Sequence, residues 1–547
     1  MGYGLFRPMS QESSIATDRK NLLLPNTERW PLDGKPIIEL VDVSIGFDGH
    51  QILSGLNLKI ETGKTTVVVG RSGSGKSVLL KLMMGLLKPD TGKVFLFGND
   101  VSETSPVDLI ELRKRMSMLF QNYALFDSLA VDENIGFPLI ENSKLKRGTI
   151  LEMAEELLDV LGLKGTNSRL PAELSGGMRK RVSLARSLIA NPEVVLFDEP
   201  TTGLDPIMIE KVDEMIALAA QKYQITSAII SHDMASTKRL ADQVAFLHEG
   251  KIVFFGTYDG FMNSDLPPVK SFVEGASTNR LSRGSASAAD VEVEKPAPRE
   301  EDPVVELVGL HKRFGDNHVL RGVDLKIYPG EITVLIGGSG SGKSVIVKHI
   351  MGLMKATAGE VRVFGEDVTP MGNDEIEAVR RRFGMVFQHA ALLDWLTIFE
   401  NVAFPVQERT SLSRSEIKER VEDVLERLFL TEIMHRLPGE VSAGQAKRAA
   451  VARALVMRPE IMIYDEPTTG QDPIRTRQVD DMIQQAQERF DIASIVISHD
   501  MSSTFRIAHQ IALLNRGQIA AHGTPRQIRS SDNEYVEKFI YAGEVAN

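Results

Sequence analysis

The sequence contains no cysteine in its 547 residues. Disulfide bonds, thiolate zinc sites and cysteine nucleophiles are therefore excluded, and any metal ion must be held by oxygen or histidine nitrogen. Long apolar runs are also missing, because the best candidate, residues 78–87, is interrupted by Lys81 and is too short to cross a bilayer. We expect no membrane-spanning helix in this sequence.

Positive charge is scarce as well. Lysine and arginine number 63 against 74 aspartates and glutamates, which gives a formal net charge of −11. Sequence-independent nucleic-acid binding needs a basic surface that neutralises phosphates, so we expect no nucleic-acid partner. Hydrophobic residues at 42% and charged residues at 25% are ordinary globular values, which exclude wholesale disorder.

The chain contains an internal repeat in constant register. Residues 38–41 (IELV) reappear as 305–308 (VELV), and the same offset of 267 relates Gly98 to Gly365 and Gly256 to Gly523. A period of this length indicates a duplicated domain rather than a solenoid of small repeats. We therefore predict the segments 1–36 as a polar N-terminal extension, 37–274 as a first domain, 275–302 as a flexible linker and 303–547 as a second domain.

The predicted linker is rich in serine, alanine, proline and charge, with almost no large apolar residue. A coil of this length has a root-mean-square span of about 30 Å, which allows the two copies to pair within one chain. Each copy alternates β-branched runs with helical patterns. The runs at 65–69, 194–197, 227–230, 332–336, 461–464 and 494–497 are short, mostly apolar and free of charged residues, as expected for parallel strands covered on both faces. The fold class predicted for each copy is α/β.

The strongest local signal is a glycine-rich segment that follows one of these strands in each copy and precedes a helical pattern. It matches G-x-x-x-x-G-K-[ST], in which backbone amides cradle phosphates, the lysine reaches the β and γ phosphates and the final hydroxyl binds Mg²⁺. A turn that only caps a helix is a poor explanation for two such matches. The predicted phosphate-binding residues are Gly70, Arg71, Ser72, Gly73, Ser74, Gly75, Lys76 and Ser77, then Gly337, Gly338, Ser339, Gly340, Ser341, Gly342, Lys343 and Ser344.

Adjacent carboxylates end a later strand in each copy. We assign Asp198 and Asp465 to the Mg²⁺ shell, and Glu199 and Glu466 to polarising an attacking water. A solvated Asp-Glu pair is the alternative. Each glutamate follows the serine of its glycine-rich loop by the same 122 positions, which disfavours that alternative.

Residues 174–178 (LSGGM) resemble the signature of ABC ATPases, and the resemblance covers about 38–275 and 303–547. It implies two P-loop NTPase domains, each with a RecA-like core, a β-subdomain and a helical signature subdomain, together with ATP hydrolysis and Mg²⁺ as cofactor. By this resemblance His232 and His499 are switch histidines beside the catalytic glutamates. The further implied ATP contacts are Phe47, Gln121, Ser175, Gly176, Gly177 and Asp205, with Phe314, Gln388, Ser442, Ala443, Gly444 and Asp472 in the second copy. The two glutamines are also implied Mg²⁺ ligands.

Some of these residues have alternative explanations. A lone phenylalanine is more often core than an adenine platform, which leaves Phe47 and Phe314 weaker candidates than the loop residues. Ser175 can also cap the helix that follows it, where two glycines leave a bare, positive N-terminus. In the second signature Ala443 replaces a glycine, and its β-carbon would restrict the backbone or crowd the γ-phosphate. We therefore predict two competent but unequal ATP sites.

The stretches around the motifs, 113–121, 124–129, 133–138 and 268–275, resemble the ATPase subunit of Mce/Mla-type lipid transporters of bacterial envelopes. This implies a MlaE-like permease as membrane partner, an Mce-domain substrate-binding protein beyond it, and in some members a STAS-domain regulator. The implied location is the cytoplasmic face of the inner membrane. Two alternatives remain: a soluble tandem ATPase acting on the ribosome, and the fused ATPase of a sugar or peptide importer.

Overall fold

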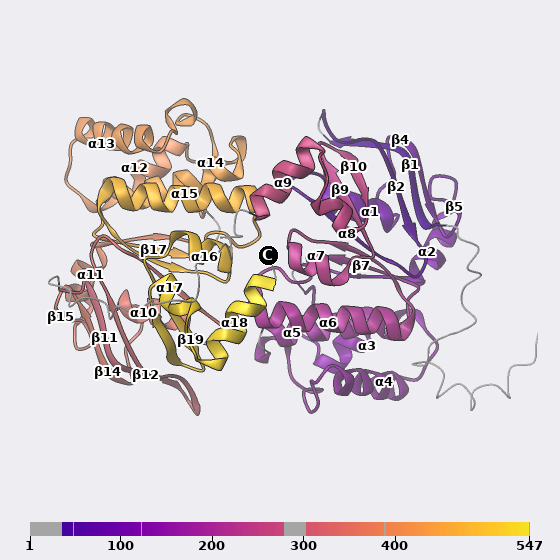
Figure 1. The fold of residues 1–547 in the computed structure, drawn as a ribbon, viewed down its shortest axis with the longest axis horizontal. Coiled ribbons are helices and arrows are strands. Elements are labelled where there is room, and N and C mark those ends of the chain that lie inside the picture. The colour runs from indigo at the N-terminus through magenta and orange to yellow at the C-terminus, as the bar shows by residue number, and fades with distance from the viewer. Residues whose placement is uncertain are drawn as a thin grey trace, which may run out of the picture. The chain divides into compact units, whose positions relative to one another are not determined.

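The structure of the chain is a computed structural model that describes residues 36–47, 49–121, 123–174, 176–277, 302–387 and 390–545. Most of the predicted N-terminal extension and linker, together with Ser175 and Gln388, lies outside the described residues. The predicted α/β class is confirmed, with mixed sheets and covering helices in both halves of the chain (Figure 1).

The described chain forms two compact units. Unit 1 comprises residues 36–200, 211–231 and 236–265. Unit 2 comprises residues 201–210, 232–235 and 266–545, so two short stretches of the first repeat belong to it. Each unit contains a six-stranded and a four-stranded sheet.

The six-stranded sheet of unit 1 has the order β10-β9-β3-β8-β7-β6. β3 lies in its middle and pairs in parallel with β8 and β9, and only β10 runs antiparallel to its neighbour. The predicted strands of the first copy lie within one residue of their observed bounds. The strands are β3 (Thr65–Gly70), β6 (Met116–Leu119), β7 (Val194–Asp198), β8 (Thr226–Ile230), β9 (Gln243–His248) and β10 (Lys251–Gly256).

The second sheet of unit 1 is antiparallel, in the order β2-β1-β4-β5. Its strands are β1 (Pro36–Phe47), β2 (His50–Glu61), β4 (Thr91–Leu96) and β5 (Asn99–Asp100). The helices of the first repeat up to residue 262 are α1 (Lys76–Met83), α2 (Pro106–Lys114), α3 (Val131–Asn142), α4 (Arg147–Val160), η2 (Pro171–Glu173), α5 (Gly176–Leu188), α6 (Pro206–Tyr223), α7 (Met234–Leu240) and α8 (Tyr258–Met262). The first residues of α6 and α7 belong to unit 2.

Unit 2 repeats this topology. Its sheets have the orders β16-β17-β18-β13-β19-β20 and β12-β11-β14-β15. The strands of the larger sheet are β13 (Ile332–Gly337), β16 (Phe383–Val386), β17 (Ile461–Asp465), β18 (Ala493–Ile497), β19 (Gln510–Asn515) and β20 (Gln518–Gly523). Those of the smaller sheet are β11 (Val305–Phe314), β12 (Asn317–Ile327), β14 (Ala358–Val363) and β15 (Glu366–Asp367).

In unit 2, three helices, α12 (Ile398–Arg409), α13 (Arg414–Arg427) and α14 (Ala443–Leu455), lie together at the end away from the antiparallel sheet (Figure 1). Helix α9, although it precedes the linker, packs against α15. The helices are α9 (Pro267–Ser277), α10 (Lys343–Ile350), α11 (Asn373–Arg380), α12 (Ile398–Arg409), α13 (Arg414–Arg427), η3 (Thr431–Ile433), η4 (Pro438–Glu440), α14 (Ala443–Leu455), α15 (Pro473–Phe490), α16 (Met501–Ile507), α17 (Pro525–Arg529) and α18 (Glu534–Val545).

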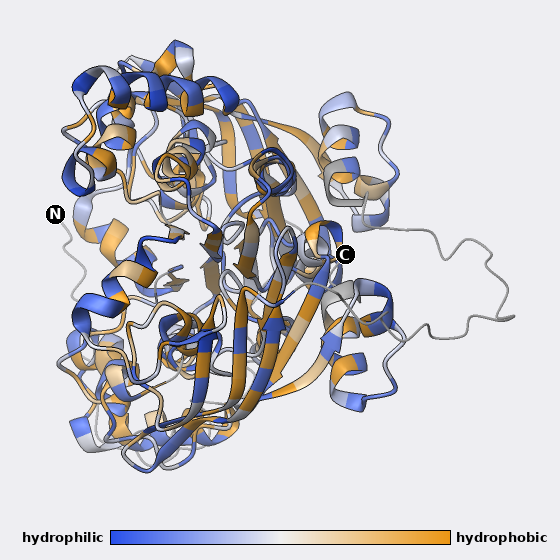
Figure 2. Ribbon diagram, turned by 90° about the vertical axis from the view of Figure 1, so that its left-hand side faces the viewer, coloured by the Kyte–Doolittle hydropathy of each residue, from blue (hydrophilic) through white to orange (hydrophobic). Residues whose placement is uncertain are grey.

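Apolar residues of the strands supply the cores. Every residue of β3 and of β13 is buried, as expected for strands covered on both faces. In Figure 2, hydrophobic and hydrophilic residues alternate along many strands, and the outward faces of the helices are largely hydrophilic. Within the described residues no helix is both long enough and apolar enough to cross a membrane.

Candidate active sites

The glycine-rich loop of unit 1 connects β3 to α1. Gly73 and Gly75 have φ angles of 81° and 100°, a left-handed region that L side chains rarely adopt, and Gly75 is the residue from which α1 begins. Lys76 is buried, and its Nζ donates hydrogen bonds to the carbonyls of Gly70 (2.8 Å) and Arg71 (3.0 Å). The fold therefore holds the ammonium at the loop whose backbone is shaped to accept phosphate.

Unit 2 builds the same loop between β13 and α10. Gly337 and Gly342 have φ angles of 146° and 112°, and a β-carbon on Gly337 would lie 2.3 Å from the carbonyl oxygen of Leu514. Lys343 Nζ donates to the carbonyls of Gly337 (2.7 Å) and Gly338 (3.2 Å). Burial lowers the pKa of Lys343, and negative charge on three nearby carboxylates only partly offsets this.

The paired carboxylates stand at the carboxyl ends of β7 and β17, as predicted. Burial, followed by the charge of the adjacent glutamate, raises the pKa of Asp198 and of Asp465. A divalent cation would offset both effects, so these carboxylates fit the Mg²⁺ that the motif implies. In unit 2, Ser344 and Asp465 line one cavity of about 570 Å³, as two ligands of one ion require.

The two glutamates that follow have backbone conformations that the sequence did not predict. Glu199 and Glu466 have φ angles of 47° and 49°, in the left-handed region where non-glycine residues are uncommon. Their amides donate to the carbonyls of Ile230 and Ile497 on the neighbouring strands, both at 3.0 Å. Such conformations cost free energy and concentrate at functional sites, where the surrounding structure enforces them.

Each catalytic candidate contacts a predicted partner. In unit 1, Gln121 Nε2 donates to Glu199 Oε2 at 3.2 Å. In unit 2, His499 Nε2 lies 2.5 Å from Glu466 Oε1, and the hydroxyl of Thr469 donates to Glu466 Oε2 at 3.2 Å. The structure thus brings the predicted glutamine to one glutamate and the predicted histidine to the other.

Asp205, predicted as an ATP contact, belongs to unit 2 and reaches its glycine-rich loop. Its Oδ2 accepts a hydrogen bond from the Ser339 amide at 2.8 Å, and its Oδ1 accepts one from the Met208 amide at 3.1 Å. Asp472 caps α15 by accepting from the amides of Ile474 and Arg475. The first aspartate is therefore tied to a phosphate-binding loop within its unit.

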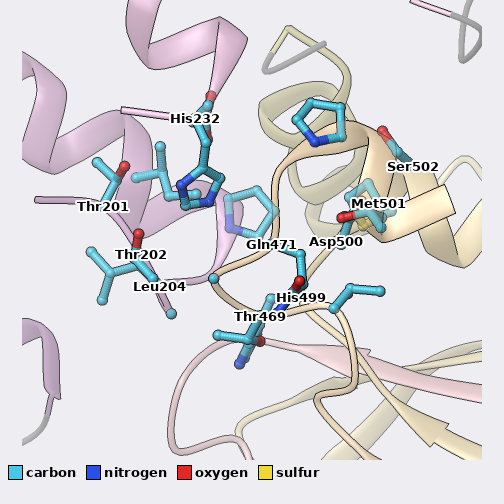
Figure 3. Close-up of a pocket in the computed structure, with 18 of the residues that line it drawn as sticks. Thr201, Thr202, Leu204, His232, Thr469, Gln471, His499, Asp500, Met501 and Ser502 are labelled. Atoms are coloured by element: carbon cyan, nitrogen blue, oxygen red, sulfur yellow. The ribbon is translucent and has the colours of Figure 1, made fainter. Parts of the chain in front are cut away.

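Unit 2 also contains a cavity of about 160 Å³, to which both switch-histidine candidates, His232 and His499, contribute (Figure 3). Threonines 201, 202, 468 and 469 line it as well. His499 Nδ1 and Ser502 Oγ are buried and have no hydrogen-bond partner among the described residues. Gln471, which stands where the first repeat has Leu204, also lines this cavity.

The signature segments begin helices α5 and α14. Ser442 caps α14, because its Oγ accepts from the Gln445 amide and the Gln445 side chain accepts in return from the Ser442 amide. Gly176, the counterpart of Ala443, begins α5 and does not have a left-handed φ, and a β-carbon there would meet only Tyr123 Oη at 3.5 Å. The backbone at this position therefore tolerates alanine, so the expected backbone restriction by Ala443 is not supported, and crowding of the γ-phosphate remains a prediction.

The two aromatic candidates are exposed. Phe47 and Phe314 end β1 and β11 with 45% and 48% of their surface accessible, so neither is a core residue. The interpretation of these phenylalanines as packed core is therefore wrong, and both remain available to stack on a planar ligand.

Two lysines of the signature helices, Lys180, which is buried, and Lys447, which is partly buried, were not predicted from the sequence. Burial lowers the pKa of Lys180 to about 7, while the charge of Glu199 acts to raise it, and burial lowers that of Lys447 to about 8. Lys447 Nζ donates to the carbonyl of Pro467, directly after Glu466. Their equal positions in the two repeats were the available signal, but only the packing shows how far these cations are buried.

Comparison with known proteins places this geometry in a family. The model described as ABC transporter matches residues 53–202 and 320–469. The glutathione import ATP-binding protein GsiA of Escherichia coli O6:H1 is 29% identical over 94% of this chain and 90% of its own length, and GsiA of Salmonella paratyphi A is 28% identical over 94% and 91%. Among solved structures, cbiO1 of Clostridium perfringens, part of the ABC transporter complex cbiONQ, is 25% identical with a TM-score of 0.41 over 45% of this chain and 98% of its own.

Proposed function

The chain belongs to the ABC transporter family as a tandem ATPase, and within that family we propose that it powers Mce/Mla-type transport of phospholipid or another hydrophobic molecule. The proposed membrane partner is a MlaE-like permease, with an Mce-domain protein beyond it and a STAS-domain protein as a possible regulator. The observation that carries this proposal is the resemblance of residues 113–121, 124–129, 133–138 and 268–275 to the ATPase subunit of such transporters.

For hydrolysis, we propose the same division of roles in both repeats. The glycine-rich loop and its lysine hold the β and γ phosphates, and Glu199 or Glu466 orients the attacking water and accepts its proton. The serine and aspartate would hold Mg²⁺, which neutralises charge on the phosphates when it is bound. The contact between His499 and Glu466 supports the role of the histidine, because it fixes the carboxylate that must face the water.

The basic side chains within the resembling stretches do not need to touch lipid. Arg113 donates to the carbonyls of Met84 and Gly85, and Arg115 forms a two-bond pair with Glu193. Both guanidinium groups therefore donate hydrogen bonds to acceptors within unit 1. Support for lipid transport therefore comes from the resemblance and not from a charged surface.

A second candidate is the ATPase of a glutathione or peptide importer. It is favoured by the GsiA proteins, which match this chain over 94% of its length and so share its tandem arrangement. Both candidates require ATP hydrolysis and a membrane partner, so the motifs do not distinguish them. The difference lies in the molecule that is moved.

Affinity purification of the chain from detergent-solubilised membranes tests the proposal. We expect an integral membrane protein to copurify, and organic extraction followed by mass spectrometry to recover phospholipid in stoichiometric amount with the complex. ATPase activity that rises with glutathione and a soluble binding protein, without enriched lipid, would instead support the second candidate. Recovery of ribosomes, with no membrane protein, would exclude both. The Glu199→Gln/Glu466→Gln chain is the matched control, because it should retain the partners without hydrolysis.

A further inference from the structure

Two histidines of unit 2 face each other across neighbouring strands, outside the glycine-rich loop and the catalytic carboxylates. His311 lies on β11 and His318 on β12, and His311 Nδ1 lies 3.1 Å from His318 Nε2. Their rings are stacked, with centroids 5.3 Å apart and planes inclined by 25°. Both residues are partly exposed.

We propose that His311 Nδ1 and His318 Nε2 bind a divalent transition-metal ion such as Zn²⁺, with water completing its coordination. Metal–nitrogen bonds of about 2.0 to 2.1 Å place two ligands of one ion roughly 2.9 Å apart at a right angle and roughly 3.4 Å apart in a tetrahedron. The observed separation of 3.1 Å falls between these values. The two nitrogens share a hydrogen bond, so the ring that donates it must move its proton to its other nitrogen, with a small side-chain adjustment, before both can bind the ion.

The surrounding side chains bear on the kind of ion that the pair would bind. The positive charges of Arg313 and Arg321 act on His318. Imidazole is a preferred ligand for zinc, copper and nickel, and the chain has no cysteine that would compete for the ion. The two arginines oppose a cation electrostatically, which favours an ion with strong affinity for nitrogen over Mg²⁺ or Ca²⁺.

The site is a property of the second repeat alone. The equivalent positions of the first repeat are Ser44 and Gln51, where Ser44 Oγ accepts a hydrogen bond from the Gly55 amide. A bound ion would tie β11 to β12 three residues before Phe314, at the end of the strand. It would thereby stiffen the hairpin that presents one aromatic candidate and leave the hairpin of Phe47 unchanged.

Titration calorimetry of the nucleotide-free, Mg²⁺-free full chain with ZnCl₂ tests this proposal. The informative variant is His311→Ser/His318→Gln, which installs the residues that the first repeat already carries in the same register. We expect it to bind one Zn²⁺ fewer per chain, or to bind that ion more than about tenfold more weakly. His50→Gln is the matched control, because His50 is an exposed histidine on the corresponding hairpin of unit 1 and should leave the titration unchanged.

Hydrogen exchange supplies a second measurement. Zn²⁺ should slow amide exchange along β11 and β12 in the natural chain, and neither single variant, His311→Ser or His318→Gln, should show that protection. Equal zinc stoichiometry and affinity in the natural and double-variant chains would overturn the proposal. So would a double variant whose hairpin exchanges faster both with and without zinc while its zinc titration is unchanged, because the histidines would then only hydrogen-bond each other.

Discussion

His499 Nε2 lies 2.5 Å from Glu466 Oε1, so the switch-histidine candidate of the second repeat forms a hydrogen bond with the proposed catalytic carboxylate. Burial acts to raise the pKa of Glu466. The hydrogen bond and charge of His499, the charge of Lys343 and the hydroxyl of Thr469 together outweigh burial, and the pKa lies below its ordinary value. His499 therefore helps to keep the partly buried carboxylate of Glu466, the proposed base, ionised.

Removing this histidine should change the pH dependence of hydrolysis. In His499→Ala, burial acts on Glu466 without its main opposing contact, so the pKa of the carboxylate rises. We expect ATPase activity to fall by about 10²-fold at neutral pH and the acidic limb of the pH–rate profile to move to higher pH. A loss of activity with an unmoved acidic limb would contradict this role. In His499→Gln the side chain can still donate a hydrogen bond to Glu466, so the acidic limb should lie between those of the natural chain and of His499→Ala.

Much of the scaffold could be predicted because its signals are local. The run 332–336 is apolar at every position except Thr333, and β13 occupies Ile332–Gly337. The loop that follows combines glycines at left-handed φ with a lysine whose reach is fixed by the motif, so Gly342 and Lys343 could be placed from the motif alone. These features depend on a few consecutive residues, which the sequence displays directly.

The features that could not be predicted depend on packing between distant segments. Desolvation lowers the pKa of Lys180 and of Lys447, and their named partners, Glu199 and Pro467, lie about 20 residues further along the chain. The left-handed φ of Glu466 accompanies a hydrogen bond from its backbone amide to the carbonyl of Ile497 on the neighbouring strand β18. Helix α9 likewise packs against α15 although the repeat assigns it to the first copy.

The partly buried Lys447 of the second signature helix predicts a stability effect that grows with pH. Burial lowers the pKa of Lys447 to about 8, below its ordinary 10.5, so between these values the folded chain binds fewer protons than the unfolded chain. The folded state of the natural chain should therefore gain stability as pH rises from 8 to 10.5. In Lys447→Met this contribution is absent. Urea unfolding of both chains at pH 8 and 10 should show the deficit of the variant growing with pH, and a shrinking deficit would contradict the shift.

The buried ion pair of α15 and α16 predicts a dependence of the opposite sign. Asp480 accepts hydrogen bonds from Ser503 Oγ at 2.5 Å and from Arg506 at 2.7 Å, yet burial outweighs these contacts and raises its pKa to about 7. The folded carboxyl therefore takes up its proton at higher pH than the unfolded one, and stability from this group falls as pH rises from about 4 to 7. The deficit of Asp480→Asn in unfolding free energy should be larger at pH 5 than at pH 8. A larger deficit at pH 8 would mean that Arg506 outweighs burial.

The departure of Ala443 from glycine predicts that the two ATP sites are unequal. By the resemblance the signatures contact nucleotide, so crowding of a γ-phosphate by Ala443 would slow hydrolysis at one of the two sites. Glu199→Gln and Glu466→Gln should therefore reduce ATPase activity by different factors. Because the backbone at Gly176 shows that this position accepts either residue, Ala443→Gly should fold normally and bring the two losses closer together. The measurement is the steady-state rate at saturating ATP of six chains: the natural chain, Glu199→Gln and Glu466→Gln, and the same three with Ala443→Gly. Equal losses in the two glutamine variants would show that the alanine leaves the sites alike.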